Sequence, residues 1–180
     1  QKDKIWENEK LLKYTPRGLV DSRSRYRTMI PDEEYENGHN LVSKTATALA
    51  NEGVKVNLGA HGQLQGLGAH WELWLLHQGG LTNMQALQAA TINGAKYIGA
   101  GNDIGSLKVG KLADLIVLDK NPLKDIRNTE SVKYTMVNGR LFDTETMDEI
   151  GNTELGRSQF WWENNKYNAA FPWHEEAQSF

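Results

Sequence analysis

Histidine is the residue type in this sequence best suited to chemistry, because a neutral imidazole can bind a metal ion or accept a proton near neutral pH. Five are present: His39, His61, His70, His77 and His174. His61 follows the alternating segment Val54–Leu58, within the glycine-flanked run Gly59-Ala60-His61-Gly62. Loops at the C-terminal ends of strands carry the functional side chains of α/β folds and barrels. We therefore expect His61 to bind zinc or act as a base, with a purely structural role as the alternative.

His70 and His77 are seven residues apart, which is two helical turns, so they could share one helix face. A zinc site made of His61, His70 and His77 is conceivable, but no His-x-His or His-Glu-x-x-His fixes two ligands on one metal. The alternatives are a helix cap or loop anchor for His70, and a half-exposed position near a helix end for His77. Glu72 could point into the same cleft as His61, or could be a first-turn carboxylate stabilised by the helix dipole. The remaining two histidines are expected at the surface or in loops; they are His39 and His174.

Other kinds of site are excluded or disfavoured by what the sequence lacks. It contains no cysteine, no Gly-x-Ser-x-Gly and no Gly-x-x-x-x-Gly-Lys-Ser/Thr, which argues against thiolate chemistry, a serine nucleophile and a phosphate loop. Twenty Lys and Arg against 23 Asp and Glu give 20 − 23 = −3, so we expect no nucleic-acid partner. Since no apolar run is long enough to span a bilayer, no membrane partner is expected either. Asp114 and Asp119 are interpreted as structural.

The elements that would position these side chains begin with half of an α/β unit. An amphipathic helix is predicted to end at Gly53. Its apolar face comprises Leu41, Thr45, Ala48 and Leu49. Val54–Leu58 then alternates apolar and polar residues, which predicts a short strand. The residues before about 31 are charged and irregular, and their basic run, residues 21–27, is predicted to be a solvated loop or the lining of an anion-binding cleft.

A glycine-rich loop and two helices follow this strand. The loop is predicted to continue as far as His70, and the helix after it to end at Gly79-Gly80. Thr82 and Gln85 then form a capping box, which is typical of a helix N-terminus. Small apolar residues recur at helical spacing beyond it, so we predict one continuous helix that ends at Gly99 and packs closely on a sheet.

Strand spacing characterises the last third of the chain. The apolar, β-branched run Leu112–Asp119 predicts a strand buried on both faces or nearly so. Val132–Val137 predicts another strand, and Asn138-Gly139 before Arg140–Phe142 predicts a hairpin with a type I′ turn. These strands would form a small antiparallel or mixed sheet. Beyond Gly151 the chain is polar with aromatic islands, which are expected to cover another surface.

Several of these segments resemble the amidohydrolase superfamily. The capped helix Leu81–Ala95 is similar to the segment after the last barrel strand of that superfamily, and Ile104–Asp119 is similar to the segment that comes next. The likeness continues to Val137–Arg140 and covers about half the chain, roughly Val54–Phe142. The imidazolonepropionase- and prolidase-like branch is the most similar, especially amidohydrolases fused to a TolB-like β-propeller.

The resemblance implies a metal-dependent hydrolase of C–N bonds, built on a (β/α)₈ barrel with a small β-sandwich beside it. Val54–Leu58 corresponds to the last barrel strand, and Gly59-Ala60-His61 stands where the family has Gly-Thr-Asp. The family's aspartate binds metal and takes a proton from the metal-bound water. His61 is therefore the candidate catalytic residue and metal ligand, although it lacks the aspartate's charge. His70 falls near a second family position and is the other candidate ligand of a divalent metal, which we expect to be zinc.

The predicted fold class is α/β: the C-terminal end of a (β/α)₈ metal-dependent hydrolase barrel plus part of a small β-sandwich. Residues 1–99 would hold the last β/α units with an irregular N-terminal segment, residues 100–145 the sandwich strands, and residues 146–180 an aromatic-containing tail. A complete barrel takes about 250 residues, and the sequence has no His-x-His. We therefore expect a segment of an enzyme that is inactive by itself.

The expected partners are the missing N-terminal part of the barrel or, through self-association, a second copy. The reason is that Val54, Val56 and Leu58 would expose barrel-facing apolar surface. A small-molecule or peptide-like substrate is expected for the complete enzyme. The chain starts at Gln1 without methionine, which indicates a processed chain or a segment of a longer one. The absence of cysteine and the resemblance to propeller-fused enzymes favour periplasmic or secreted localisation. The alternatives are a non-catalytic packing or binding module with the same fold and a small zinc protein that uses its own histidines.

Overall fold

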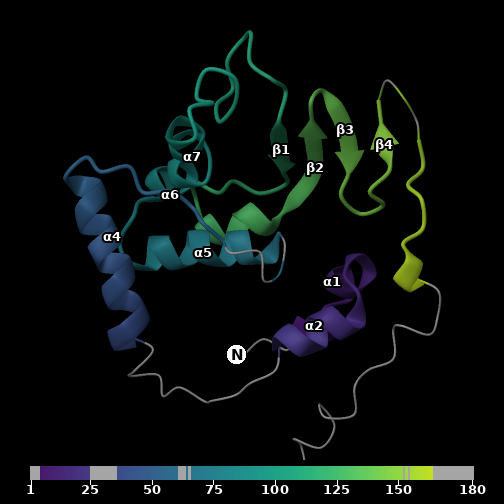
Figure 1. Ribbon diagram of the computed structural model, residues 1–180, viewed down its shortest axis with the longest axis horizontal. Helices are drawn as coiled ribbons and strands as arrows, with labels where there is room; N and C mark the ends of the chain where they lie inside the picture. Colours follow the sequence, from purple (N-terminus) through teal and green to yellow (C-terminus); the bar gives the residue numbers. More distant parts are fainter. Residues whose placement is uncertain are drawn as a thin grey trace, which may run out of the picture. The chain divides into compact units, whose positions relative to one another are not determined.

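The computed structural model of the chain describes residues 5–24, 36–60, 64, 66–151, 153 and 155–163 (Figure 1). The chain divides into two compact units, Ile30–Arg157 and a smaller one that joins Gln1–Met29 with Ser158–Phe180. Helices and a sheet are both present, so the α/β class is confirmed at this coarse level. Among the described residues, no helix combines the length and apolar character that crossing a membrane requires.

In the smaller unit, the described residues form short helices where an irregular segment was predicted. They are η1 (Ile5–Glu7), α1 (Glu9–Tyr14), α2 (Arg17–Ser24) and η4 (Trp161–Glu163). Asn8 caps α1 by accepting a hydrogen bond from the N–H of Leu11 (2.9 Å). Arg17 pairs with the buried Asp21 one turn further on (3.0 Å), which stabilises α2. The basic run therefore begins as helix, and its last residues, 25–27, lie outside the described residues.

One of the two aromatic islands packs within the smaller unit. The ring of Phe160 stacks on Trp162 with centroids 4.4 Å apart, and Tyr14 meets Phe160 edge-on at 6.4 Å. Aromatic pairs prefer these two geometries, because the ring quadrupole disfavours a face-to-face sandwich without offset. This island thus covers another part of the chain, as predicted. The second island, residues 171–173, lies outside the described residues.

The larger unit places helices before a sheet (Figure 1). Its helices are η2 (Glu36–Asn40), α4 (Leu41–Asn51), α5 (Leu67–Gln78), α6 (Asn83–Ala89), α7 (Ile92–Tyr97) and η3 (Ile126–Glu130). Its strands are β1 (Leu115–Leu118), β2 (Val132–Val137), β3 (Arg140–Asp143) and β4 (Glu149–Ile150). The core is a cluster that joins α5, the start of α6 and η3, and its buried members are Leu73, Leu81, Ala86 and Ile126.

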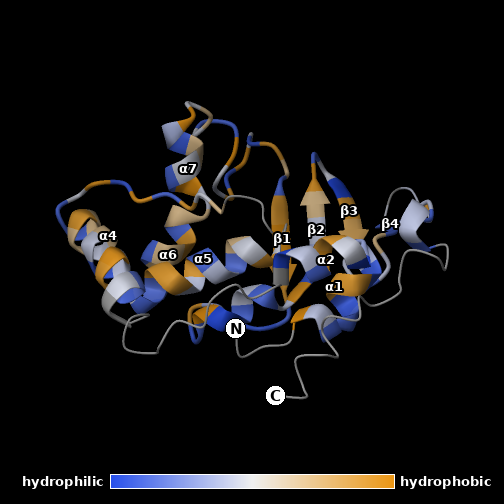
Figure 2. Cartoon of the chain, turned by 60° about the horizontal axis from the view of Figure 1, so that its bottom comes forward, coloured by the Kyte–Doolittle hydropathy of each residue, from blue (hydrophilic) through white to orange (hydrophobic). Residues whose placement is uncertain are grey.

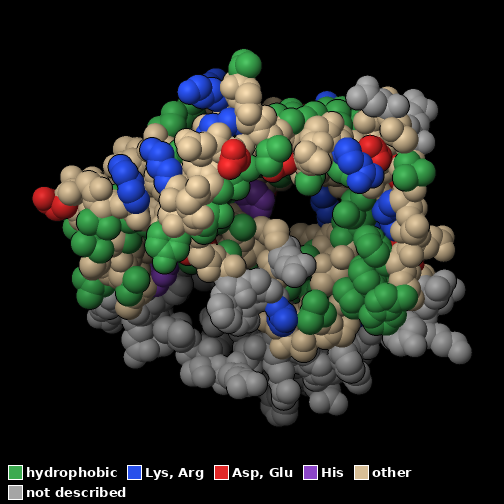
Figure 3. All heavy atoms as spheres, turned by 45° about the horizontal axis from the view of Figure 1, so that its top comes forward, with side chains coloured by type: hydrophobic (Ala, Val, Ile, Leu, Met, Phe, Trp, Pro, Cys, Tyr) green, Lys and Arg blue, Asp and Glu red, His purple; other side chains and the backbone are tan. Residues whose placement is uncertain are grey.

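Helix α4 confirms the predicted helix but buries a different face. Ser43 is buried, and it lies so close to Gly79 at the end of α5 that a side chain at position 79 would overlap it. Leu41 and Leu49 belong to the predicted apolar face, and they are 64% and 48% exposed. Figure 3 shows hydrophobic side chains, in green, at the surface on the side of the molecule where α4 lies. The helix therefore has a second, uncovered apolar face.

Helix α5 begins earlier than predicted. Leu67–His70, expected to be loop, form its first turn. Gly66 has a positive φ of 78°, and the N–H of Gly68 donates to the carbonyl of Leu64 (2.7 Å), so the chain turns into the helix here. The helix ends at Gly79, as predicted.

The predicted helix up to Gly99 is interrupted and forms α6 and α7. The capping box of Thr82 and Gln85 is confirmed at the start of α6. The chain leaves helical geometry at Thr91, whose φ and ψ are −135° and −98° and whose hydroxyl donates to the carbonyl of Leu87 (2.7 Å). Threonine hydroxyls compete for backbone groups in this way and often bend helices. The change in direction lets Asn93 of α7 reach the segment before the loop, as described below.

The sheet is four-stranded and antiparallel, in the order β1-β2-β3-β4, which confirms the predicted small sheet. Asn138 and Gly139 both have positive φ, 50° and 79°, as a type I′ turn requires. The predicted burial of β1 is wrong: Ile116 and Val117 are 51% and 40% exposed, although Figure 2 shows the strand as strongly hydrophobic. The physical reason is that the described residues place no second layer over these side chains, and a sheet buries its faces only against another layer.

Candidate functional site

The predicted strand Val54–Leu58 is not a strand in this structure, since it has no strand neighbour among the described residues. Helices hold its backbone instead. The N–H of Val54 donates to Leu49 of α4 (3.0 Å), and the N–H of Leu58 donates to Ala89 of α6 (3.0 Å). A strand requires a ladder of hydrogen bonds to a neighbouring strand, so the sequence pattern alone cannot form one. The segment is therefore held by helices and pairs with no described strand.

The two ends of this segment have different surroundings. Leu58 packs against the core cluster of α5, α6 and η3, while Val54 is 52% exposed. The prediction that Val54, Val56 and Leu58 would expose apolar surface is therefore confirmed for Val54, whereas Val56 and Leu58 are half-buried. The side-chain oxygen of Asn57 is buried without a hydrogen-bond partner among the described residues, which is rare for a buried acceptor.

Glu72 of α5 holds the end of the segment. Its Oε1 accepts a hydrogen bond from the N–H of Gly59 (3.0 Å), across 13 residues of sequence. Of the two interpretations of Glu72, the first-turn carboxylate does not hold, because α5 begins at Leu67 and the side chain binds the backbone after Leu58. A carboxylate thus lies where the segment ends, which is the end at which barrels place their functional groups.

His61 lies outside the described residues, and its role as catalytic residue and metal ligand stays a prediction. The described neighbours on its N-terminal side are Gly59 and Ala60. The hydrogen bond from Gly68 to Leu64 ties down the C-terminal side of the same loop. The loop is therefore anchored at both ends by described contacts.

His70 lies in the first turn of α5 and contacts η3. Its Nδ1 is 3.1 Å from Oγ1 of the buried Thr129, which also accepts a hydrogen bond from Nε1 of Trp74 (3.1 Å). Burial lowers the pKa of His70 below 6.5, and the nearby charge of Glu130 opposes this shift only in part. The neutral ring leaves Nε2 as the nitrogen for a further partner. Its predicted metal binding stays a prediction.

The other described histidines have contacts within the helices. His77 Nδ1 is 2.8 Å from the carbonyl of Leu81, so it donates a hydrogen bond across the turn after α5. His39 Nε2 is 3.4 Å from the hydroxyl of Ser43. These contacts suit structural roles. His174 lies outside the described residues.

The candidate residues that the structure describes do not form one cluster. On a helix, residues 70 and 72 point about 200° apart, so His70 faces η3 while Glu72 faces the segment end. Among the described residues, no group of three or more His, Asp or Glu side chains could hold a metal ion. The described part of the chain therefore does not supply a complete metal site. Thr129 and Asn93 were not found from the sequence, because their contacts join segments 59 and 37 residues apart without a local pattern.

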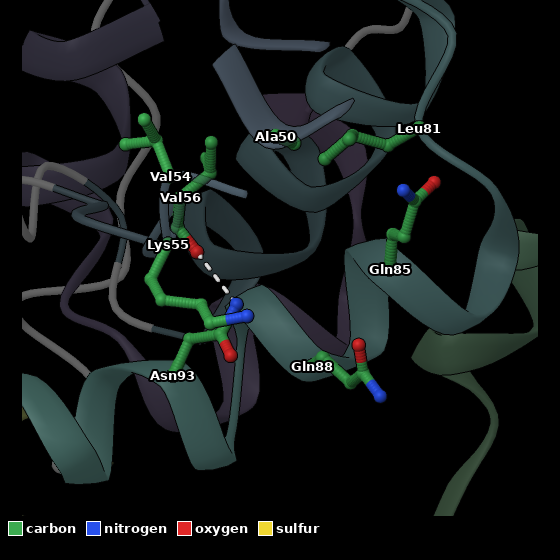
Figure 4. A pocket seen from close by; sticks show the side chains of 8 residues that line it. All are labelled: Ala50, Val54, Lys55, Val56, Leu81, Gln85, Gln88 and Asn93. Atoms are coloured by element: carbon green, nitrogen blue, oxygen red, sulfur yellow. Dashed lines mark hydrogen bonds between the residues drawn. The ribbon is translucent and has the colours of Figure 1, made fainter. Parts of the chain in front are cut away.

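A small pocket lies beside the beginning of the segment (Figure 4). Its volume is about 100 Å³, and it is lined by Ala50, Val54, Lys55, Val56, Leu81, Gln85, Gln88 and Asn93. Asn93 Nδ2 donates to the carbonyl of Val56 at its edge (3.1 Å). No histidine or carboxylate is among these residues, and Lys55 is the one titratable side chain in the lining.

A family model described as "Amidohydrolase family" matches residues 43–142 of the chain. The chain belongs to the amidohydrolase family. The 5′-deoxyadenosine deaminase of Methanobrevibacter smithii is 36% identical over 77 residues, which cover 41% of this chain and 18% of that protein. The imidazolonepropionase of Syntrophobacter fumaroxidans is 57% identical over 44 residues, which cover 24% of this chain and 10% of that protein.

Solved structures agree with this assignment. A Xaa-Pro dipeptidase crystallised with methionine in its active site is similar to 70% of this chain at 27% identity, with a TM-score of 0.54. The similarity covers 32% of that enzyme's chain. The family and its imidazolonepropionase- and prolidase-like branch are therefore confirmed, and members of this family are generally metal-dependent. The chain spans a third or less of the length of these relatives.

Proposed function

We propose that this chain is the C-terminal segment of a metal-dependent amidohydrolase that hydrolyses C–N bonds. The relatives named above act on such bonds by their names: a deaminase, an imidazolonepropionase and a dipeptidase. The substrate class we infer is an amide, cyclic amide or peptide-like small molecule. The chain provides the last β/α units of the barrel and a wall of the substrate cleft.

The observation that carries this proposal is that segment 54–60 contacts helices but has no strand beside it among the described residues. Helices α4 and α6 accept hydrogen bonds from its backbone, and Leu58 packs against the helical core cluster. A barrel strand has helices outside and other strands beside it, so this segment has the surroundings of a last strand without its neighbours. The exposed Leu41 and Leu49 of α4 support the same reading, because a barrel helix packs on neighbours at both sides.

The sheet supports the second part of the proposal, a share in a small β-sandwich. Residues directly opposite each other form an apolar row across all four strands: Leu115, Met136, Leu141 and Ile150. None of them is fully buried. A sheet must bury its apolar face against another layer, so we propose that the rest of the protein supplies that layer.

The metal site is proposed to be shared with the rest of the protein. His61 is the ligand that we assign to this chain, His70 is the second candidate, and the remaining ligands come from other barrel strands. A zinc ion bound there would lower the pKa of its water and polarise the scissile carbonyl. Because the described residues hold no metal cluster, we propose that the isolated chain is inactive.

The experiment compares the 180-residue chain with the polypeptide encoded by the complete reading frame. Both are assayed with Zn²⁺, Mn²⁺ or Co²⁺ against Xaa-Pro dipeptides, imidazolonepropionate and 5′-deoxyadenosine. We expect metal-dependent turnover of a substrate by the complete protein and none by the chain. Turnover by the chain itself would refute its proposed inactivity.

A non-catalytic packing module is the second candidate, because the described residues lack a metal cluster. The reading frame upstream of Gln1 separates the two candidates. The enzyme requires that it encode a His-x-His and further barrel strands. An unrelated domain there, or a complete protein that binds no metal, would favour the packing module.

A further inference from the structure

We infer that Glu72 is a positioning residue of the proposed amidohydrolase site: its carboxylate fixes the backbone at Gly59, where segment 54–60 ends. The inference rests on the proposed function, since that function makes this end of the segment the edge of the substrate cleft. The direct observation is the hydrogen bond from the N–H of Gly59 to Glu72 Oε1 (3.0 Å).

Glu72 differs from the other groups that hold the segment. Backbone carbonyls of α4 and α6 accept from Val54 and Leu58, and the Asn93 amide donates to Val56. Each of these contacts comes from a helix outside the loop between the segment and α5. Glu72 lies in the second turn of α5, the helix that follows that loop, so its bond links the end of the segment to this helix. Losing it would free the segment end while leaving the three earlier contacts in place.

Among the described residues, no other partner of the Glu72 carboxylate explains its position. It forms no salt bridge with a described residue, and its neighbours on the other side of α5, His70 and Trp74, contact η3 instead. A hydrogen bond to a charged acceptor is stronger than one between neutral groups, and a fixed acceptor restricts the backbone that donates to it. The contact is therefore suited to hold the Gly59 backbone in one position.

The contact does not depend on glycine at position 59, because a side chain would fit there. A Cβ at position 59 would lie 3.9 Å from Glu72 Oε1, which is ordinary van der Waals distance. The feature that Glu72 requires is the N–H of residue 59 and not the missing side chain. A Gly59→Ala variant should consequently keep the contact.

The test uses Glu72→Ala, Glu72→Gln and a control, Glu52→Ala, in the complete protein. Glu52 is an exposed carboxylate at the end of α4. We expect Glu72→Ala to lower kcat/KM by about 10- to 100-fold, the scale of loss that a displacement near 1 Å produces. Glu72→Gln should restore most of it, since the amide oxygen still accepts from Gly59. Glu52→Ala should match the wild type, and all three variants should have its melting temperature within a few degrees.

Amide hydrogen exchange of Gly59 in the 180-residue chain supplies a readout independent of activity. Exchange should be faster in Glu72→Ala and near wild type in Glu72→Gln. Unchanged exchange in Glu72→Ala, or wild-type activity in that variant, overturns the inference. The inference is also overturned if Glu72→Gln is as impaired as Glu72→Ala. In that case the negative charge of Glu72 would act on the reaction directly, and not through its hydrogen bond to Gly59. An inactive wild-type complete protein instead counts against the proposed function, and the exchange data still decide whether Glu72 holds Gly59.

Discussion

The close approach of α4 and α5 makes Gly79→Ala the most informative single substitution for the fold. Gly79 has helical backbone angles, φ −74° and ψ −9°, so alanine fits its conformation without strain. Its added Cβ, however, would lie closer than 3.0 Å to the carbonyl carbon, carbonyl oxygen and Cβ of Ser43. Two of these atoms are backbone and cannot rotate away. The two helices must therefore separate.

Overpacking of this kind typically costs about 1–3 kcal/mol and occasionally more. Because backbone meets backbone here, we expect the upper end, about 3 kcal/mol. For a chain of this length, each kcal/mol lowers the melting temperature by roughly 2–4 °C, so the expected fall is roughly 6–12 °C. Thermal and urea unfolding followed by circular dichroism would measure it.

Gly94→Ala is the matched control for this substitution. Gly94 is a helical glycine of α7, and a Cβ there would meet nothing within 4 Å. Alanine favours a helix over glycine by roughly 0.5–1 kcal/mol, so this variant should be as stable as the wild type or slightly more so. If Gly79→Ala behaved like Gly94→Ala, the described packing of α4 on α5 would be wrong.

Three further predictions concern single contacts. Thr82→Ala removes the cap of α6 and should reduce the free energy of unfolding by about 1 kcal/mol, measured by urea denaturation, whereas Thr82→Ser should retain most of it. Thr129→Val removes the group shared by His70 and Trp74 and should cost about 1–3 kcal/mol in the same assay, and no loss would contradict its role in joining α5 to η3. Arg140 lowers the pKa of Glu149 below 4.5 through a side-chain hydrogen bond, so its stabilisation is present above pH 4.5 and is lost as the pH falls through the folded-state pKa. Glu149→Gln should remove that part of the acid dependence of the melting temperature, and an unchanged profile would count against the pair.

Local patterns in the sequence predicted local structure well. The capping box at Thr82 and the type I′ turn at Asn138-Gly139 depend on neighbouring residues only, and both are present as predicted. Strand β2 is also present as predicted, because the turn pairs it with β3. The early start of α5 and the break at Thr91 were missed. Each depends on a hydrogen bond, at Leu64 or Leu87, that the apolar periodicity does not encode.

Functional residues were harder to predict, because they depend on contacts between distant segments. Glu72 was named as a candidate because of its place after a glycine-rich loop, and the structure adds its partner, Gly59. No sequence pattern indicated Thr129, since its hydrogen bonds with His70 and Trp74 form only when η3 packs on α5. Sequence spacing could place His70 and Glu72 on one helix, but only the helix start at Leu67 shows that they face opposite sides.

Three of the incorrect or incomplete predictions in the larger unit share one physical cause. Val54–Leu58 fails to pair as a strand, the apolar side chains of α4 stay exposed, and β1 keeps Ile116 and Val117 uncovered. In each case the sequence pattern is that of a buried element, and the missing part is a neighbour rather than a suitable residue. Apolar residues are placed at such positions because burial there stabilises the fold. Three elements that lack partners among the described residues, in a chain that spans a third or less of its relatives, support the proposal made above that the complete protein supplies their neighbours.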